Sequence, residues 1–338
     1  MPKGMKRVAL ALSSGGPRGF AYIGAIEELL SRGYEITSIA GTSAGALVGG
    51  IYAARGLDAF KEWLYGLDQL KVMSLMDVSL SRNYLVKGDK VIAAIKERVP
   101  DVNIQDLPVP FTAVASDLHT GEEILFREGP LFDAIRASIS IPSMFRPVKW
   151  KGRTLVDGGL VNTFPLNRVA RTGDDILVGF NVNRIDAQQI RAFLASREAL
   201  EQGESHRHEV AKTVLKDTLS ASGDPILDRM RHAGEMGSRL LKERMESQRM
   251  ARQLLSEGKE IGIPMDADDN YASILDRSFG IMNHTLAKMA EDLCTPDILV
   301  DLPYDSYHGV YGYSHAREIA GTGRKLMAEA LDRYEGAR

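Results

Sequence analysis

The sequence predicts an α/β fold with parallel strands, on three observations. An apolar run at residues 7–12 leads through a glycine-rich turn into a helical pattern, and a second strand–turn–helix unit follows at residues 36–56. Residues 175–181 form a nearly continuous apolar run, as expected of a strand that is buried on both faces. Because consecutive parallel strands need a crossover, usually a helix, this succession indicates a sheet with helices packed on it.

The turns delimit the two units. In the first unit, the strand at residues 7–12 ends in the glycine-rich turn, and the helix after it is predicted to stop at Gly33, a residue suited to the left-handed conformation. The apolar residues of this helix recur at spacings of three and four, at Ile23, Ile26 and Leu30. In the second unit, a strand at residues 36–40 ends at residues 41–45, and the helix that follows runs to Gly56.

The pattern between residues 63 and 86 is irregular and predicts loop or irregular helix. The remaining elements are delimited by glycine, proline and polar clusters. They are a helix at 91–99, a strand at 111–116 with a hairpin partner at 123–126, a helix at 131–140, strands at 153–156, 175–181 and 297–302, and a terminal helix at 315–334.

Composition and charge exclude several classes of protein. The 338 residues include 42 Lys and Arg against 45 Asp and Glu, a net charge of −3, which provides no electrostatic footprint for nucleic acid. The single cysteine, Cys294, excludes an intramolecular disulfide and a cysteine-based zinc site. The apolar run before Ser13 is shorter than a signal-peptide core, and no run approaches the roughly 20 apolar residues of a membrane span. A cytoplasmic location is therefore expected.

One segment differs from the rest in charge density. Residues 184–260 interleave basic and acidic side chains in nearly equal numbers, which is typical of solvated helices, while apolar residues still recur at helical spacing. The sequence thus predicts three parts. They are an α/β core at residues 1–183, a charged helical insertion or cap at residues 184–290, and a C-terminal strand and helix at residues 291–338 that complete the core.

Residues 41–45, Gly-Thr-Ser-Ala-Gly, fit the G-x-S-x-G nucleophile elbow. In that motif the serine stands on a tight strand-to-helix turn, and the flanking glycines allow strained backbone angles and close neighbours. Ser43 follows a predicted strand and precedes a predicted helix, as the motif requires. The pentapeptide by itself is equally consistent with an ordinary turn in which the serine caps the helix.

A glycine-rich loop at residues 14–19 opens the first helix, where backbone N–H groups point outward. Acyl transfer needs such donors to stabilise an oxyanion. Pro17 has no N–H group, so the available donors are Gly15, Gly16 and Arg18. The alternative, a phosphate-binding nucleotide loop, fits poorly, because neither G-x-G-x-x-G nor G-x-x-x-x-G-K-[ST] is present.

A serine nucleophile needs a general base, and the sequence offers two kinds of candidate. The C-terminal histidines His308 and His315 follow the chain order of α/β-hydrolase triads, although a nucleophile as early as position 43 is unusual for that fold. Asp157 follows a predicted strand in the stretch Val-Asp-Gly-Gly. An exposed Asp, with a pKa of about 3.9, is a weak base unless its site is dry.

Three motifs, taken in order, resemble those of the patatin-like phospholipase family: the loop at 15–19, the elbow at 41–45 and Asp-Gly-Gly at 157–159. The resemblance covers about residues 7–183 and resumes near 297–323. Two positions depart from the family pattern. Ser14 replaces the first glycine of the loop, and Tyr22 stands where histidine is usual.

The resemblance implies a three-layer α/β/α fold with a mostly parallel central sheet, and a Ser–Asp dyad in place of a triad. Ser43 would be the nucleophile and Asp157 its base, with Gly15, Gly16 and Arg18 at the oxyanion. The implied activity is hydrolysis of lipid acyl esters without a metal or other cofactor. A lipid or ester substrate and transient contact with a membrane surface are the partners it suggests.

Two other functions stay open on the sequence. Ser14 and the charged segment are compatible with a non-catalytic protein that binds a lipid or a phosphate group. The same dyad could also transfer an acyl group to an alcohol instead of water. The sequence determines neither the preferred lipid nor the oligomeric state.

Overall fold

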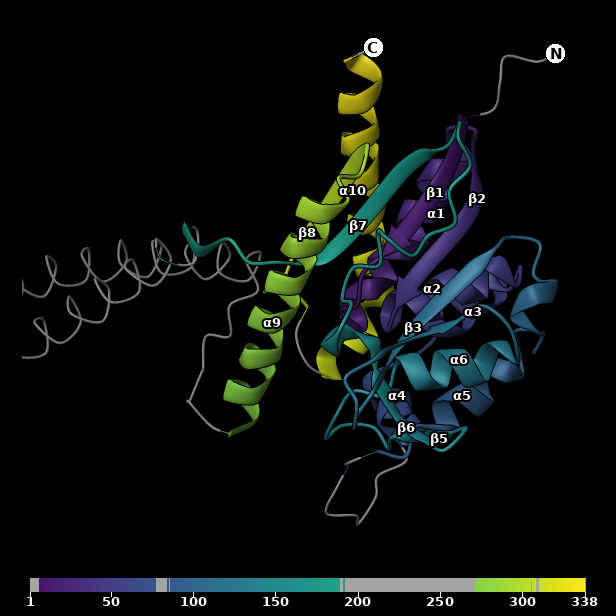
Figure 1. Ribbon diagram of the computed structural model, residues 1–338, viewed down its shortest axis with the longest axis vertical. Helices are drawn as coiled ribbons and strands as arrows, with labels where there is room; N and C mark the ends of the chain where they lie inside the picture. Colours follow the sequence, from purple (N-terminus) through teal and green to yellow (C-terminus); the bar gives the residue numbers. More distant parts are fainter. Residues whose placement is uncertain are drawn as a thin grey trace, which may run out of the picture. The chain divides into compact units, whose positions relative to one another are not determined.

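The computed structural model describes residues 6–76, 84, 86–188, 191, 271–304, 306–307 and 310–337. The chain divides into two compact units, one made of residues 1–185 and 267–338 and the other of residues 186–266. The first unit is an α/β structure in which helices flank a central sheet, and all the elements labelled in Figure 1 belong to it.

Within the described residues the sheet has eight strands, in the order β5-β6-β3-β2-β1-β7-β8, with β4 paired to β3. Neighbouring strands from β3 through β2, β1 and β7 to β8 are parallel, whereas the β3–β4, β3–β6 and β5–β6 pairs are antiparallel. The strands are β1 (Lys6–Leu12), β2 (Tyr34–Thr42), β3 (Phe111–Asp117), β4 (Glu123–Phe126), β5 (Val148–Trp150), β6 (Arg153–Asp157), β7 (Ile176–Arg184) and β8 (Ile298–Pro303).

The helices on the two faces pack against different residues of the same strands. Leu10 and Leu12 of β1 join the larger core, whereas the small side chains of Ala9 and Ala11 join a second core with Ala287 of α9. The helices are α1 (Ala21–Ser31), α2 (Ala44–Ala53), α3 (Leu57–Tyr65), α4 (Gln69–Leu75), α5 (Asp89–Lys96), α6 (Leu131–Ser138), α9 (Tyr271–Leu293) and α10 (Ala316–Gly336). Short 3-10 helices are η1 (Gly16–Phe20), η2 (Ile104–Asp106), η3 (Gly158–Leu160) and η4 (Val310–His315).

The expected α/β class and the two strand–turn–helix units are confirmed, and Gly33 adopts the left-handed conformation with φ +77°. The segment between residues 63 and 86, predicted as loop or irregular helix, contains the end of α3 and the regular helix α4 in its described part. These helices have nine and seven residues, too few turns for a clear periodic pattern. The Asp68 side chain caps α4 by accepting a hydrogen bond from the Lys71 N–H group. The three-residue strand β5 was also not anticipated.

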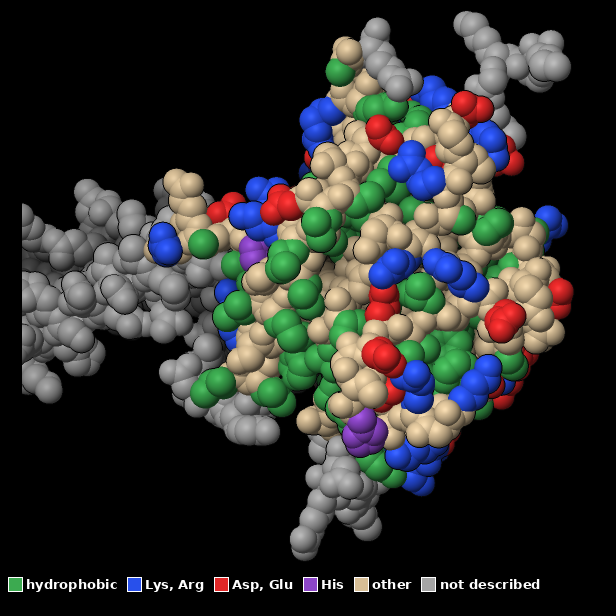
Figure 2. All heavy atoms as spheres, in the orientation of Figure 1, with side chains coloured by type: hydrophobic (Ala, Val, Ile, Leu, Met, Phe, Trp, Pro, Cys, Tyr) green, Lys and Arg blue, Asp and Glu red, His purple; other side chains and the backbone are tan. Residues whose placement is uncertain are grey.

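The segment predicted as a charged helical insertion, residues 184–290, falls mostly outside the described residues. Its C-terminal part, in α9, packs against β7 within the first unit. Hydrophobic side chains gather along α9 in Figure 2, and its exposed large apolar residues are Ile274, Ile281, Met289 and Leu293. Within the part of the chain that the structure describes, no helix is both long and apolar enough to cross a membrane.

Candidate active site

Ser43 stands on the turn between β2 and α2 in a strained backbone conformation, φ 55° and ψ −118°. Glycine is required on both sides of it. A Cβ atom on Gly41 would lie 2.4 Å from the Gly45 carbonyl carbon, and one on Gly45 would lie 2.3 Å from the Leu12 carbonyl oxygen. The serine side chain does not cap α2, so the alternative of an ordinary capped turn does not apply.

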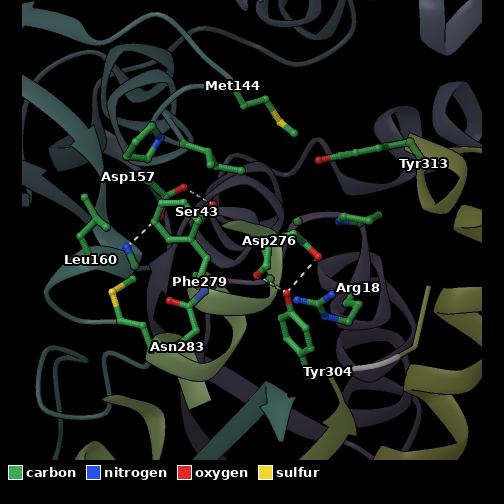
Figure 3. A pocket seen from close by; sticks show the side chains of 18 of the residues that line it. Arg18, Ser43, Met144, Asp157, Leu160, Asp276, Phe279, Asn283, Tyr304 and Tyr313 are labelled. Atoms are coloured by element: carbon green, nitrogen blue, oxygen red, sulfur yellow. Dashed lines mark hydrogen bonds between the residues drawn. The ribbon is translucent and has the colours of Figure 1, made fainter. Parts of the chain in front are cut away.

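Asp157, at the end of β6, is in direct contact with Ser43 (Figure 3). The Ser43 hydroxyl donates a hydrogen bond to Asp157 Oδ2 at 2.5 Å, and the Gly159 N–H group donates to Asp157 Oδ1 at 2.8 Å. Both side chains are buried. The next residue must be glycine, because a Cβ atom on Gly158 would lie 2.3 Å from the carbonyl oxygen of Val114.

Hydrogen bonds from neighbouring strands and from α6 hold the two residues together. The Ser43 N–H group donates to Ser138 Oγ at 2.8 Å, and the Ser138 hydroxyl in turn donates to the Val114 carbonyl at 2.6 Å. The Asp157 N–H group donates to the carbonyl of Ser140 at 2.9 Å. Each partner belongs to a packed element or to its end, so the contact between Ser43 and Asp157 is held on both sides.

The pKa of Asp157 reflects this surrounding. Burial raises the pKa of the carboxyl to about 6, and the hydrogen bonds from Ser43 and Gly159 oppose that rise by stabilising the ionised form. At neutral pH the carboxylate is therefore ionised and is a stronger base than an exposed Asp. The dry site that a carboxylate base requires is thus present around Asp157.

The structure does not bring the histidine candidates to Ser43. His315 is exposed at the end of η4, lines neither cavity at the serine, and has Ser314 Oγ at 3.4 Å from its Nδ1. His308 lies outside the described residues. Of the base candidates that the structure describes, Asp157 alone contacts the serine.

The glycine-rich loop lies beside the pair. Gly15 and Gly16 line the same cavity as Ser43, and within the described residues their N–H groups have no hydrogen-bond acceptor. A Cβ atom on Gly15 would lie 2.1 Å from Val182 Cγ2, so this position requires glycine. The backbone of Ser14 anchors the loop, because its N–H group donates to the Thr163 carbonyl at 2.8 Å and its carbonyl accepts from Asn183 Nδ2 at 2.7 Å.

Arg18 also lines this cavity, and its side chain contacts Val182 and Tyr304. Its Nε donates to the carbonyl of Val182 at 3.0 Å, and its guanidinium lies 4.3 Å from the centre of the Tyr304 ring. Arg18 therefore lines the same cavity as Ser43, while these two contacts hold its side chain against β7 and the residue that follows β8.

In the described part of the chain, Ser43 lines two cavities. The first, of about 150 Å³, carries the polar groups of the loop, of Asp157 and of α9, including Asp276 and Asn283. The second, of about 130 Å³, is lined almost wholly by apolar side chains, most of which come from α2, α3, α4 and α5 and from the segments that follow α3, α4 and α6. The residues that line both cavities are Gly16, Ser43, Met76, Ile141, Met144 and Tyr313.

Sequence reasoning missed the contributions of α9 and η4. Asn283 accepts a hydrogen bond from the Thr163 hydroxyl at 2.9 Å, and that hydroxyl lies 2.8 Å from the carbonyl of Gly159, so α9 is tied to the Asp-Gly-Gly loop. In the sequence, the contribution of α9 is indicated only by the helical spacing of Phe279, Met282 and their apolar neighbours, which lie in the segment predicted as the charged insertion. Among the described residues no group of three or more His, Cys, Asp or Glu side chains could hold a metal ion.

The fold and the site together define an α/β protein that presents a serine on a nucleophile elbow against a buried aspartate. Comparison with known sequences is in agreement, since residues 10–170 match the family described as "Patatin-like phospholipase". An NTE family protein of Mycobacterium bovis is 34% identical over 97% of this chain and 92% of its own length. The chain therefore belongs to the patatin-like phospholipase family, a family of lipid hydrolases.

More distant matches are also found. A patatin-like phospholipase domain-containing protein of Caenorhabditis elegans is 30% identical over 53% of this chain and 14% of its own length. The crystal structure of VipD from Legionella pneumophila covers 96% of this chain and 67% of that one, with a TM-score of 0.40 and 14% identity.

Proposed function

We propose that this protein is a serine-dependent lipid acyl-ester hydrolase of the phospholipase A, lysophospholipase or esterase type, with Ser43 as nucleophile and Asp157 as base. The observation that carries the proposal is the 2.5 Å hydrogen bond from the Ser43 hydroxyl to Asp157 Oδ2 at the edge of a cavity. The N–H groups of Gly15 and Gly16, beside the same cavity, are suited to stabilise an oxyanion.

Acylation begins when Ser43 Oγ attacks the carbonyl carbon of the ester and its proton passes to Asp157 Oδ2. The carbonyl oxygen becomes an oxyanion, which accepts hydrogen bonds from the loop N–H groups. The intermediate then expels the alcohol, whose oxygen takes the proton from Asp157, and the acyl group remains on Ser43. The raised pKa of Asp157 favours both transfers, because the carboxyl accepts and returns a proton near neutral pH.

Deacylation repeats these steps with water as the nucleophile. Asp157 removes a proton from the water as its oxygen attacks the acyl carbonyl, and then returns the proton to Ser43 Oγ as the fatty acid leaves. In this mechanism, neither acylation nor deacylation requires a metal or another cofactor. Transfer to an alcohol acceptor would follow the same path with the alcohol in place of water.

The two cavities suggest how a lipid ester is oriented at Ser43. The apolar cavity is suited to the acyl chain, because each methylene that it buries contributes about 0.8 kcal/mol of transfer free energy. The cavity bordered by Arg18, Asp276 and Asn283 is suited to the alcohol part, which is more polar in a phospholipid or lysophospholipid. This arrangement supports a lipid ester over a small polar ester as substrate.

Covalent labelling tests the proposal. A fluorophosphonate probe is expected to label the wild-type protein at Ser43 and to leave Ser43→Ala unlabelled, and p-nitrophenyl esters are expected to be hydrolysed by the wild type but not by Ser43→Ala. Asp157→Asn should lower turnover by at least about 10²-fold, because general-base assistance contributes factors of this size. His315→Ala, outside the cavities, is the matched control. An unlabelled wild type, or equal labelling of Ser43→Ala, would refute the proposal.

A further inference from the structure

Tyr313, in η4, is one of the six residues that line both cavities. Its side chain extends from η4 toward Ser43, with the hydroxyl at its leading end (Figure 3). The hydroxyl also lies near the glycine-rich loop, since a Cβ atom on Gly16 would be 3.8 Å from it. Tyr313 therefore brings a polar atom from the C-terminal part of the chain to the loop that offers N–H donors.

Two contacts hold the tyrosine in this place. Its ring meets Phe20 edge to face, with the ring centres 5.8 Å apart. The preceding residue packs against the loop so closely that a Cβ atom on Gly312 would lie 2.7 Å from Pro17 Cγ. The ring is thus fixed against η1, and the hydroxyl cannot move far without displacing this packing.

The hydroxyl is available as a donor. Within the part of the chain that the structure describes, it has no hydrogen-bond partner. Burial raises the pKa of Tyr313 to about 12, with Arg18 opposing and Asp157 reinforcing the rise, so the hydroxyl keeps its proton at neutral pH. The other tyrosine of the first cavity differs, because the hydroxyl of Tyr304 donates to the carbonyl oxygen of Asp276 at 2.9 Å.

We propose that Tyr313 is a further catalytic residue, whose hydroxyl donates a hydrogen bond to the oxyanion of the tetrahedral intermediate beside the N–H groups of Gly15 and Gly16. This inference rests on the proposed ester hydrolysis. The tyrosine proton stays on its own oxygen throughout, and Asp157 carries the proton that moves between Ser43, the alcohol and water. Tyr313 thus supplies a donor in addition to those of the loop, from a segment about 300 residues distant in the chain, where the backbone nitrogen of Pro17 carries no hydrogen to donate.

The test compares Tyr313→Phe with a matched substitution in the same region, Tyr307→Phe. The Tyr307 hydroxyl bonds Thr322 at 3.1 Å and Glu318 at 3.3 Å and lines neither cavity. Hydrolysis of p-nitrophenyl butyrate is measured for both variants and the wild type, and kcat is expressed per mole of Ser43 titrated to completion by a fluorophosphonate. Affinity for an alkyl trifluoromethyl ketone, which forms a tetrahedral oxyanion on the serine, is measured alongside affinity for butyrate, which forms none.

For Tyr313→Phe, kcat is expected to fall on the order of 10²-fold with KM nearly unchanged, as for loss of one oxyanion donor. Affinity for the trifluoromethyl ketone should fall by a similar factor, while affinity for butyrate and the values for Tyr307→Phe stay near those of the wild type. Wild-type kcat and ketone affinity in Tyr313→Phe, or a change confined to KM, would overturn the inference and leave the proposed function intact. A wild type that neither hydrolyses esters nor reacts at Ser43 would overturn both.

Discussion

Asp157 combines burial with two hydrogen bonds, and in the proposed mechanism this balance sets the pH range in which it can activate Ser43. Burial alone would favour the protonated carboxyl, which cannot accept the serine proton, whereas the donors at Ser43 and Gly159 favour the carboxylate. The result, a pKa of about 6, places the residue between an ordinary Asp and a histidine. A buried aspartate can therefore take the part that histidine has in a triad.

The expected pH profile follows from this value. Because the proposed base acts in its ionised form, kcat/KM for a p-nitrophenyl ester should rise about tenfold per pH unit well below pH 6, bend near pH 6 and level off above it. His315→Ala should show the same bend, measured over a range in which thermal unfolding confirms the fold. A rate independent of pH from 4.5 to 7.5, or a bend that disappears in the histidine variant, would assign the titrating base elsewhere.

At the residue scale, the local requirements of the site could be predicted and the distant ones could not. Ser43 and Asp157 were both proposed from short motifs, because a strained turn and a close backbone approach demand glycine at fixed neighbouring positions. Asn283 and Tyr313 reach the same site from far along the chain, and no local pattern of residues encodes their approach. Their positions depend on how α9 and η4 pack.

At the scale of elements, strands that lead into helices were predictable, and so was α5, which the sequence predicts as a helix at 91–99, whereas α3 and α4 beside the apolar cavity were not. The units at β1–α1 and β2–α2 combine buried runs with glycine turns, whereas α4 has only seven residues. Together with α5, these short helices nevertheless supply part of the apolar lining, including Val72 of α4 and Val91 and Ile95 of α5. Selectivity for the acyl chain should therefore depend in part on them.

The size of the cavity predicts a chain-length limit. A cavity of about 150 Å³ can hold benzene, so one of about 130 Å³ offers room for about six carbons. In a series of p-nitrophenyl esters, kcat/KM should rise about fourfold per methylene and level off near the hexanoyl ester. Val91→Phe fills part of the cavity and should move this break to shorter chains while leaving the acetyl ester nearly unaffected.

Val102→Phe is the matched control for this prediction. Val102 is also half-buried and packs against the same core, but it lines neither cavity. Its chain-length profile should match that of the wild type. If Val91→Phe kept the wild-type profile as well, the acyl chain would bind outside the apolar cavity.

At the scale of the whole molecule, the two ends of the described chain close against each other. The sequence predicted a C-terminal strand and helix, and α10 packs directly on α1. The closeness of that packing was not predictable, because it depends on paired backbones. A Cβ atom on Gly24 would lie 1.9 Å from the Ala320 carbonyl oxygen, and one on Gly323 would lie 1.9 Å from the Ala21 carbonyl oxygen.

Two glycines of α10 provide a matched test of this closure. Gly323→Ala should lower the free energy of unfolding by about 1–3 kcal/mol or more, because the added methyl meets backbone that cannot move aside cheaply. Gly321 is exposed with nothing within 4 Å, so Gly321→Ala should instead raise that free energy by up to about 1 kcal/mol through helix propensity. Denaturant unfolding of both variants measures these changes.

The same two substitutions also test whether the packing of α10 on α1 affects the active site. Because η4 runs directly into α10, a shift of α10 away from α1 should displace Tyr313 and lower ester turnover in Gly323→Ala at temperatures where the protein is still folded. Gly321→Ala should keep the wild-type turnover. If Gly323→Ala lost stability but kept full turnover per titrated Ser43, the position of η4 would depend on its contacts with Phe20 and Pro17 and not on α10.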